Sequence, residues 1–188
     1  MHNSRSALAS QREFVARAGA SVLRIAADPS SRWIQLGVYP GGHDAVAAAW
    51  QRSVGGELPT SARTVAPAAG GRVYRIAQDQ YLLRDVADAQ AAALLSALPE
   101  DAAGWTDLTG SRVAIRITGS AARDVLSQCV TIDLHPTVFV DGAFAQTGIH
   151  HVGGLLERNG PDDYGYIALR TYALTVWEAL TDAAQRAA

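Results

Sequence analysis

The residues whose chemistry could serve a reaction are few and widely spaced in this sequence. His135 follows Asp133 by two positions, and this spacing lets a carboxylate orient an imidazole for proton transfer. The same spacing also suits a histidine that only ties a loop to its own backbone by hydrogen bonds, which is the simpler interpretation. His150 and His151 are adjacent in a predicted strand, where neighbouring side chains point to opposite faces and cannot bind one metal ion together.

Two further features resemble reactive motifs, but neither has the residues that such a motif needs. Gly119-Ser120-Ala121-Ala122 lies at a predicted strand-to-helix turn, but it lacks the further glycines and the lysine of a phosphate-binding loop. It also lacks the second glycine of a nucleophile elbow, so we interpret Ser120 as the cap of the following helix. The single cysteine, Cys129, lies on the apolar side of that helix, which predicts a buried and unreactive thiol.

The composition favours a protein that works inside a complex. Hydrophobic residues make up 48% of the 188 residues and charged residues 18%, so part of the surface is expected to be apolar. A net charge of -2 gives no electrostatic signature of a nucleic-acid or anionic-membrane partner. All 16 basic residues are arginine, which excludes a lysine acting as a Schiff base or general base.

The sequence gives no sign of export or of a membrane segment. No apolar run approaches the roughly 20 residues needed to cross a bilayer. The first residues lack the apolar centre of a secretory signal, and one cysteine excludes an intrachain disulfide. We therefore expect a cytoplasmic protein.

The stretch from Trp105 to Thr147 organises the elements that must position these residues. Three branched apolar residues alternate with other residues from Val113 to Thr118, which predicts a strand. Gly119 ends the alternation, and apolar residues then recur at helical spacing from Ala121 to Cys129. Pro136 excludes helix at the preceding residue and predicts an extended entry into the next segment.

Similar patterns predict the remaining elements. We expect a loop over 60–71 and a turn over 159–163, where Asn159-Gly160 favours positive φ. The strands are predicted at 21–26, 33–39, 72–77, 81–83, 138–148, 152–158 and 164–170, and the helices at 44–54, 86–98 and 171–188.

The order of these elements predicts an α+β fold of two split-βαβ-like lobes, because a similar alternation of strands and helices occurs twice. We expect a flexible N-terminal arm over 1–20, a first lobe over 21–108 and a second lobe over 109–188, together forming one compact unit. No sequence repeat supports the duplication, so this prediction depends on element order alone.

The central stretch also resembles a known family. Spaced and chemically unlike residues match, in register over about forty positions, the small gamma subunit of bacterial heterotetrameric sarcosine oxidase. These are Asp107-Leu108-Thr109, Arg112, Ile115-Arg116-Ile117, Gly119, Ala121 to Leu126, Asp133 to Pro136, Phe139, Gly142 and Ala145-Gln146-Thr147. Weaker similarity extends over most of the chain after about Arg32. The family usually carries Gly-Cys-Pro or Gly-Cys-Ser just before Asp-Leu-His-Pro, where this chain has Cys129-Val130-Thr131.

The resemblance implies a fold, a complex and a division of labour. The gamma subunit is similar in fold to the folate-binding T-protein of the glycine cleavage system. The family's complex oxidatively demethylates sarcosine or a similar secondary amine. Its alpha and beta subunits hold FAD, FMN and NAD, and tetrahydrofolate binds in the alpha subunit. This chain would then bind no cofactor or metal, have no catalytic residue, and contact alpha in a complex with beta and delta-like subunits.

Two hypotheses of different class follow. In the first, the chain is a non-catalytic subunit that docks on alpha through a loop rich in specific residues. The interface residues that we predict are Arg112, Asp133, His135, Pro136 and Phe139. In the second, the chain is a stand-alone tetrahydrofolate-dependent aminomethyltransferase or demethylase, which needs carboxylates converging on a pteridine. The carboxylates nearest the predicted second lobe are Asp107, Asp133 and Glu157.

Overall fold

The computed structural model describes residues 7–8, 13–18, 20–28, 32–61 and 65–187. The chain divides into two compact units, each an antiparallel sheet with helices. Unit 1 combines residues 1–31 with 110–188, and unit 2 comprises residues 32–109. The mixed α/β architecture confirms the predicted fold class, but the boundaries of the lobes differ from the predicted ones.

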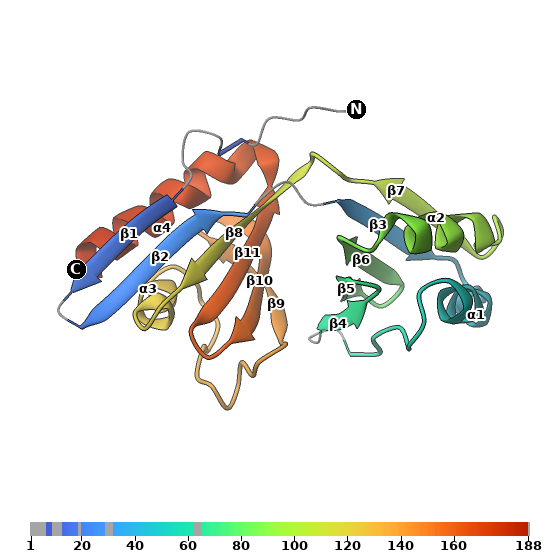
Figure 1. Ribbon diagram of the computed structural model, residues 1–188, viewed down its shortest axis with the longest axis horizontal. Helices are drawn as coiled ribbons and strands as arrows, with labels where there is room; N and C mark the ends of the chain where they lie inside the picture. Colours follow the sequence, from blue (N-terminus) through green and yellow to red (C-terminus); the bar gives the residue numbers. More distant parts are fainter. Residues whose placement is uncertain (1–6, 9–12, 19, 29–31, 62–64, 188) are drawn as a thin grey trace. The chain divides into compact units, whose positions relative to one another are not determined.

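Unit 2 is a continuous segment that forms a five-stranded antiparallel sheet in the order β4-β5-β6-β3-β7 (Figure 1). Helices α1 and α2 pack against each other and share one apolar core with the sheet. The elements are β3 (Trp33–Val38), α1 (His43–Ser53), β4 (Val65–Ala68), β5 (Gly71–Ala77), β6 (Gln80–Arg84), α2 (Asp88–Ala97) and β7 (Ala103–Asp107).

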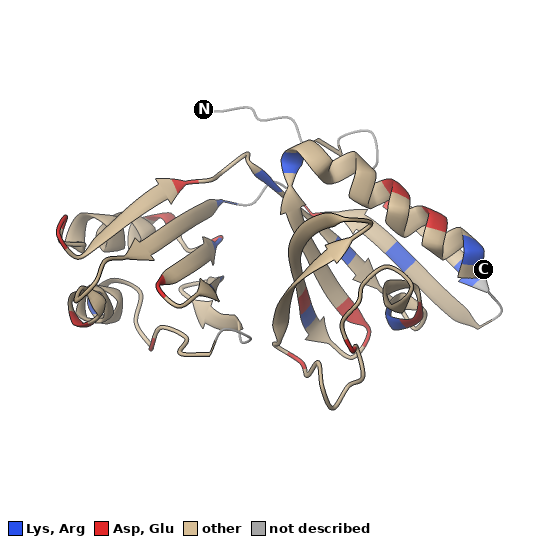
Figure 2. Cartoon of the chain, turned by 180° about the vertical axis from the view of Figure 1, so that it is seen from behind, with Lys and Arg blue, Asp and Glu red and all other residues tan. Residues whose placement is uncertain are grey.

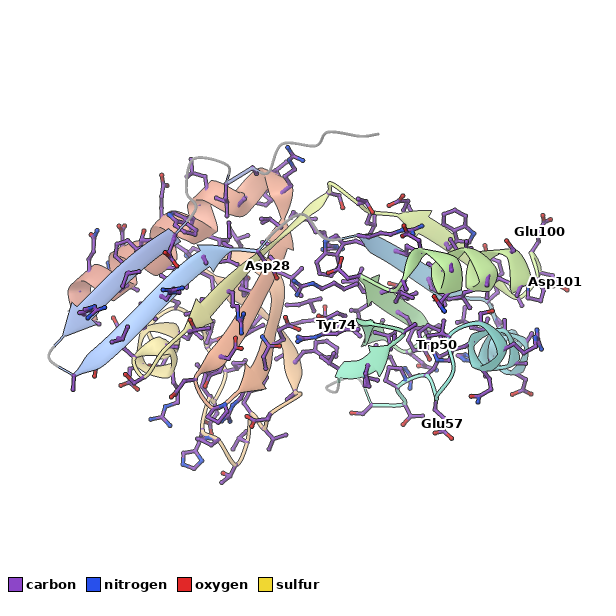
Figure 3. All side chains as sticks on the ribbon, in the orientation of Figure 1. Asp28, Trp50, Glu57, Tyr74, Glu100 and Asp101 are labelled. Carbon is purple, nitrogen blue, oxygen red and sulfur yellow. The ribbon has the colours of Figure 1, made fainter. Side chains whose placement is uncertain are left out.

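The core of unit 2 follows from the alternation of its strands. Ile34 and Leu36 of β3 point to the face that the helices cover, as the sequence predicts. Trp50 of α1 is buried in the same core (Figure 3). By contrast, Glu100 and Asp101 occupy the exposed turn after α2 (Figure 3).

Unit 1 forms a six-stranded antiparallel sheet in the order β1-β2-β8-β11-β10-β9 (Figure 1). Helices α3 and α4 pack together on one side of this sheet. The elements are β1 (Glu13–Ala18), β2 (Ser21–Ala27), β8 (Arg112–Thr118), α3 (Ala122–Ser127), β9 (Phe144–Ile149), β10 (Val152–Gly160), β11 (Asp163–Leu169), the 3₁₀ turn η1 (Arg170–Tyr172) and α4 (Ala173–Ala187).

The predicted lobe boundary was wrong for the N-terminal segment. Residues 21–27 do not join the lobe that follows them in sequence, because β2 pairs with β8 in the register Ile25↔Ile117. Of the predicted arm, residues 1–6, 9–12 and 19 lie outside the described residues. Its described part is ordered: Glu13–Ala18 is strand β1, and Leu8 is buried in the core of unit 1.

Three predicted segments also differ in detail. The predicted loop over 60–71 contains the short strand β4. The predicted strand over 138–148 begins only at Phe144, because residues 136–142 form a stabilised loop. The turn between β10 and β11 is at Pro161–Asp162, since Asn159 and Gly160 still belong to β10 and Gly160 has no positive φ.

Acidic and basic residues are interspersed over the elements of both units (Figure 2). No helix within the described part of the chain is both long and apolar enough to span a bilayer.

Candidate functional site: a stapled loop between α3 and β9

The candidate site is the loop Asp133–Gly142, which connects α3 to β9. Its entry is fixed locally, because the carboxylate of Asp133 accepts a hydrogen bond from the His135 amide at 2.8 Å. The His135 carbonyl then accepts hydrogen bonds from the amides of Val138 and Phe139 at 2.8 and 2.9 Å. These contacts close a tight turn over residues 135–139 without any regular element.

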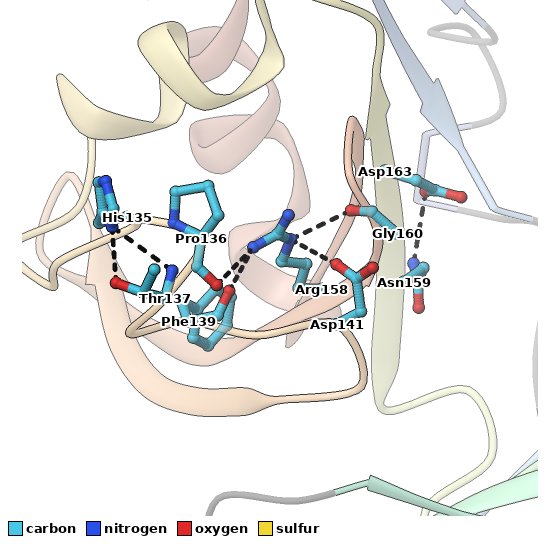
Figure 4. A network of polar contacts seen from close by, with 9 residues as sticks. All are labelled: His135, Pro136, Thr137, Phe139, Asp141, Arg158, Asn159, Gly160 and Asp163. Atoms are coloured by element: carbon cyan, nitrogen blue, oxygen red, sulfur yellow. Dashed lines mark hydrogen bonds and ion pairs between the residues drawn. The ribbon is translucent and has the colours of Figure 1, made fainter.

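A buried arginine holds this turn in place from its side (Figure 4). Arg158 of β10 is 5% exposed, and its Nη1 donates to the carbonyl of Phe139 at 2.6 Å and to that of Pro136 at 3.5 Å. Its Nε donates to the carbonyl of Gly160 at 3.2 Å and lies 2.8 Å from a carboxylate oxygen of Asp141. The guanidinium is thus satisfied by the loop it supports, as a buried cation must be.

The loop buries one large apolar side chain and exposes its two neighbours. Phe139 is 5% exposed and belongs to the core of unit 1, whereas the flanking Val138 and Val140 are 57% and 50% exposed. His135 is exposed, and its Nδ1 lies 2.8 Å from the Thr137 hydroxyl. The loop therefore presents a small apolar surface beside a histidine that its own loop orients.

The structure brings three of the five predicted interface residues together. Asp133, His135 and Pro136 are exposed on the loop, but Phe139 is buried in the core of unit 1. The prediction that Arg112 lies near this loop was wrong. The loop borders the Asp163 end of β11, and the β8–β11 register places Arg112 opposite Leu169 at the other end.

Arg112 has a different environment at its end of the sheet. It is half-buried, its Nε has no hydrogen-bond partner, and burial lowers the pKa of its guanidinium. Asp107, one of the candidate carboxylates, belongs to unit 2, where it accepts a hydrogen bond from the Thr109 amide at 2.8 Å. Hydrogen bonds from the side chain and the backbone of Thr109 lower the pKa of Asp107.

Asp133 and Glu157, the two candidate carboxylates that lie in unit 1, do not converge on one site. Asp133 is exposed and engaged by its own loop. Glu157 is buried on β10 and lies across Gly165 of the neighbouring strand. Since Glu157 and Arg158 are adjacent in a strand, their side chains leave opposite faces of the sheet, and Glu157 faces away from the stapled loop.

The strand-to-helix turn after β8 has no room for a phosphate group. Gly119 has φ +109°, and a Cβ there would lie 2.2 Å from the Val22 carbonyl oxygen, so strand β2 fills the space. The prediction that Ser120 caps α3 was wrong: that helix has no side-chain cap. The Ser120 hydroxyl instead accepts a hydrogen bond from the Val22 amide at 3.1 Å and fastens the turn to β2.

The structure also shows where the histidine pair and the single cysteine lie. His150 and His151 are not in a strand but form the two-residue turn of the β9–β10 hairpin, with φ +49° and +69°. Cys129 is half-buried against the core, and burial raises the pKa of its thiol, as expected of an unreactive cysteine. Within the described residues, no three histidine, cysteine or acidic side chains gather as metal ligands.

Sequence reasoning missed the residue that builds the site. Arg158 lies 16 residues or more beyond the loop in sequence, at the end of a predicted strand whose neighbours are polar, and no local pattern distinguishes it from a solvated arginine. A weak signal existed in Asp141-Gly142, because an acidic residue inside an otherwise apolar segment predicts a cationic partner.

Comparisons with known proteins agree on one family. Residues 40–186 match the family described as "Sarcosine oxidase, gamma subunit family". The curated "Sarcosine oxidase subunit gamma" of Arthrobacter sp. is 31% identical over 157 residues, which cover 82% of this chain and 75% of that protein.

Solved structures extend the agreement to the fold. A chain of the heterotetrameric sarcosine oxidase from Corynebacterium sp. U-96, in complex with pyrrole 2-carboxylate, is 26% identical. The match has a TM-score of 0.83 and covers 97% of this chain and 95% of that one. Glycine cleavage system aminomethyltransferase T from Bartonella henselae matches with a TM-score of 0.55 and 17% identity, over 80% of this chain and 43% of that one. This second likeness confirms the predicted T-protein-like fold.

Proposed function

This chain belongs to the sarcosine oxidase gamma subunit family, and from this premise we propose that it is a non-catalytic subunit that docks on the large alpha subunit and stabilises it. Its complex is a heterotetrameric flavoprotein oxidase that removes the methyl group of sarcosine or a related secondary amine. The observation that carries the proposal is the match to a heterotetrameric sarcosine oxidase over nearly the full length of both chains.

The polar groups of the described residues support a structural role. Three polar side chains of unit 1, those of Asp133, Ser120 and Arg158, make hydrogen bonds to backbone groups of the chain itself. The strand-to-helix turn is filled by β2, so it offers no cradle for a dinucleotide. FAD, FMN, NAD and tetrahydrofolate belong to the alpha and beta subunits in this proposal, and the chain works with them and a delta-like subunit in the cytoplasm.

The loop Asp133–Gly142 is the docking element that we propose. It is exposed and is held in one shape before any partner binds, which reduces the entropic cost of association. Asp133 and His135 supply its polar rim, and the exposed Pro136 follows them. Phe139 supports the loop from within, and Arg112 lies at the other end of the sheet and takes no part in this contact.

One set of experiments distinguishes a non-catalytic subunit from a stand-alone folate-dependent enzyme. The purified chain is expected to show no flavin absorbance and no amine oxidation, and calorimetric titration with tetrahydrofolate is expected to give no heat of binding. Co-expression with the other subunits of its complex is expected to yield an assembly that retains this chain. Micromolar folate binding or turnover by the chain alone would favour the enzyme instead.

A point variant tests the loop itself. His135→Ala is expected to weaken retention of this chain in the complex about threefold to tenfold, since it removes one rim contact. His43→Ala is the matched control, because His43 is also exposed and also contacts a polar side chain, that of Asp79. Equal retention of both variants would remove His135 from the interface.

A further inference from the structure

The polar rim does not include the two large apolar side chains that the loop exposes. Val138 and Val140 flank Phe139, which fills the core of unit 1. Because Phe139 fixes the backbone between them, the two valines are held out to solvent together. Single exposed apolar residues are normal on a protein surface, but two on one three-residue tip form a local apolar surface.

The buried guanidinium of Arg158 holds the backbone of this tip in one conformation. Arg158 reaches the carbonyls of Pro136, Phe139 and Gly160 and the carboxylate of Asp141. Desolvating a guanidinium is costly, and the contacts with the loop and with Gly160 compensate for that cost. A loop that merely connected α3 to β9 would gain nothing from this arrangement, whereas a loop that binds a partner gains preorganisation.

The charge of the tip indicates what kind of surface it fits. Residues 134–140 contain no aspartate, glutamate, lysine or arginine. The charge of Arg158 is buried and is paired with Asp141. An acidic or basic partner surface would find nothing to pair with at the tip, so an apolar partner surface is the complementary one.

We propose that Val138 and Val140 form the apolar anchor by which this chain binds an apolar pocket on the large alpha subunit of its heterotetramer. Arg158 is the positioning residue that holds the anchor in its binding shape. The proposal rests on the proposed function, and it deepens that function by assigning the centre of the interface to residues outside its polar rim. Another subunit of the heterotetramer is the occupant, because the chain matches a chain of a heterotetrameric enzyme over almost its whole length, and alpha is the subunit that the proposed function names.

The first test places a charge in the anchor. The double variant Val138→Asp, Val140→Asp is co-expressed with the other subunits, and dissociation of the assembled complex is followed by mass photometry on dilution. We expect dissociation at a concentration at least about 100-fold higher, because an unpaired carboxylate in a closed apolar contact is strongly unfavourable. The matched control is Val15→Asp, Val22→Asp, since these valines are 45% and 36% exposed on β1 and β2.

The second test uses variants that do not alter the charge. Val138→Thr, Val140→Thr preserves the volume of both side chains and is expected to weaken the complex about tenfold. Arg158→Lys preserves the charge but cannot reach three carbonyls and a carboxylate at once. We expect faster hydrogen exchange at the Val138 and Phe139 amides, unchanged exchange in the β10–β11 ladder, and a complex weakened about tenfold.

The outcomes separate this proposal from the function on which it rests. If the unmodified chain is retained in the complex and the valine variants dissociate like the β1–β2 control, the anchor is wrong and the proposed function stands. If the unmodified chain fails to assemble, the proposed function itself fails. If the valine variants abolish a self-association of this chain and leave the complex intact, a second copy is the occupant and our assignment is overturned.

Discussion

The two units share one sheet order but close it with strands from different parts of the chain. In unit 2 the order is β4-β5-β6-β3-β7, and in unit 1 the corresponding order is β9-β10-β11-β8-β2, with β1 added at the edge. In unit 2, β3 pairs with β6 on one side and with β7, which follows α2 directly, on the other. In unit 1, β8 pairs with β11 on one side and with β2, which precedes all of unit 2 in sequence, on the other.

The junctions beside these closing strands are also equivalent. After β3, the turn into α1 passes Gly42, where a Cβ would lie 2.2 Å from the carbonyl oxygen of Ala102, just before β7. After β8, the turn into α3 passes Gly119, where a Cβ would lie 2.2 Å from the carbonyl oxygen of Val22 in β2. The comparison teaches that the duplication is one of architecture, in which unit 1 replaces a local strand by a distant one.

The largest effect is expected from removing that distant strand. Deletion of residues 1–28 takes away β1 and β2 together with the buried side chains of Leu8, Leu23 and Ile25. Each buried aliphatic side chain stabilises a fold by about 1.5–3 kcal/mol, and β8 would be left as an open edge. The loss approaches the whole stability of a typical domain. Hydrogen exchange is expected to show unit 1 unprotected while the sheet of unit 2 persists, and protection of β8 in the truncated chain would contradict this.

A chain with its N-terminal strands moved to the C-terminal end tests whether the connectivity of unit 1 matters. A protein that starts at Arg32 and carries residues 7–28 after Ala187 through a flexible linker gives unit 1 the continuous connectivity of unit 2. We expect it to recover the protection of β8 and most of the thermal stability, because the β2–β8 pairing does not depend on the order of the segments. Failure to recover would show that the covalent link from β2 to unit 2 is itself required.

The glycine junctions are expected to give the next largest effect. Gly119→Ala meets both a positive φ of +109° and the Val22 carbonyl, and it is expected to cost about 3–5 kcal/mol. Gly42→Ala meets the Ala102 carbonyl at an ordinary φ of -82°, and about 1–3 kcal/mol is expected. Urea unfolding followed by circular dichroism measures both variants.

A control separates the two causes. Gly41 has φ +82° and open space around it, so Gly41→Ala reports the backbone strain alone, at about 1–2 kcal/mol. If Gly119→Ala costs no more than Gly41→Ala, the close approach to β2 is not a constraint, and the equivalence of the two junctions is lost.

The sequence predicts those parts of the fold whose residue pattern lies within one helix or strand. It does not predict which distant strands pair. The alternation in β3 and β8 and the helical spacing in α1 and α4 lie within single elements, and the structure confirms them. The assignment of β2 depends on which of two sheets it joins, and no local pattern states that. The short strand β4 has the composition of a loop and exists because it pairs with β5.

The contacts of the candidate site also fall into two groups, those predictable from sequence spacing and those that depend on strand pairing. Asp133 and His135 are near in sequence, and their contact through the loop backbone is predictable from the spacing of an Asx turn. The burial of Phe139 and the role of Arg158 depend on the pairing of β10 with β9 and β11, so they emerge only from the folded sheet. The separation of Arg112 from the loop likewise follows from the β8–β11 register.

The smallest expected effect comes from the hairpin turns that the two units share. The β4–β5 turn is Ala69-Gly70 with φ +41° and +86°, and the β9–β10 turn is His150-His151 with φ +49° and +69°. Glycine adopts such angles without strain, so His151→Gly is expected to stabilise unit 1 by about 0.5–1 kcal/mol, and Gly70→His to destabilise unit 2 similarly. Thermal unfolding measures both. A loss of stability on His151→Gly would mean that the histidine side chains, whose rings lie 5.8 Å apart, compensate for the strain of their backbone.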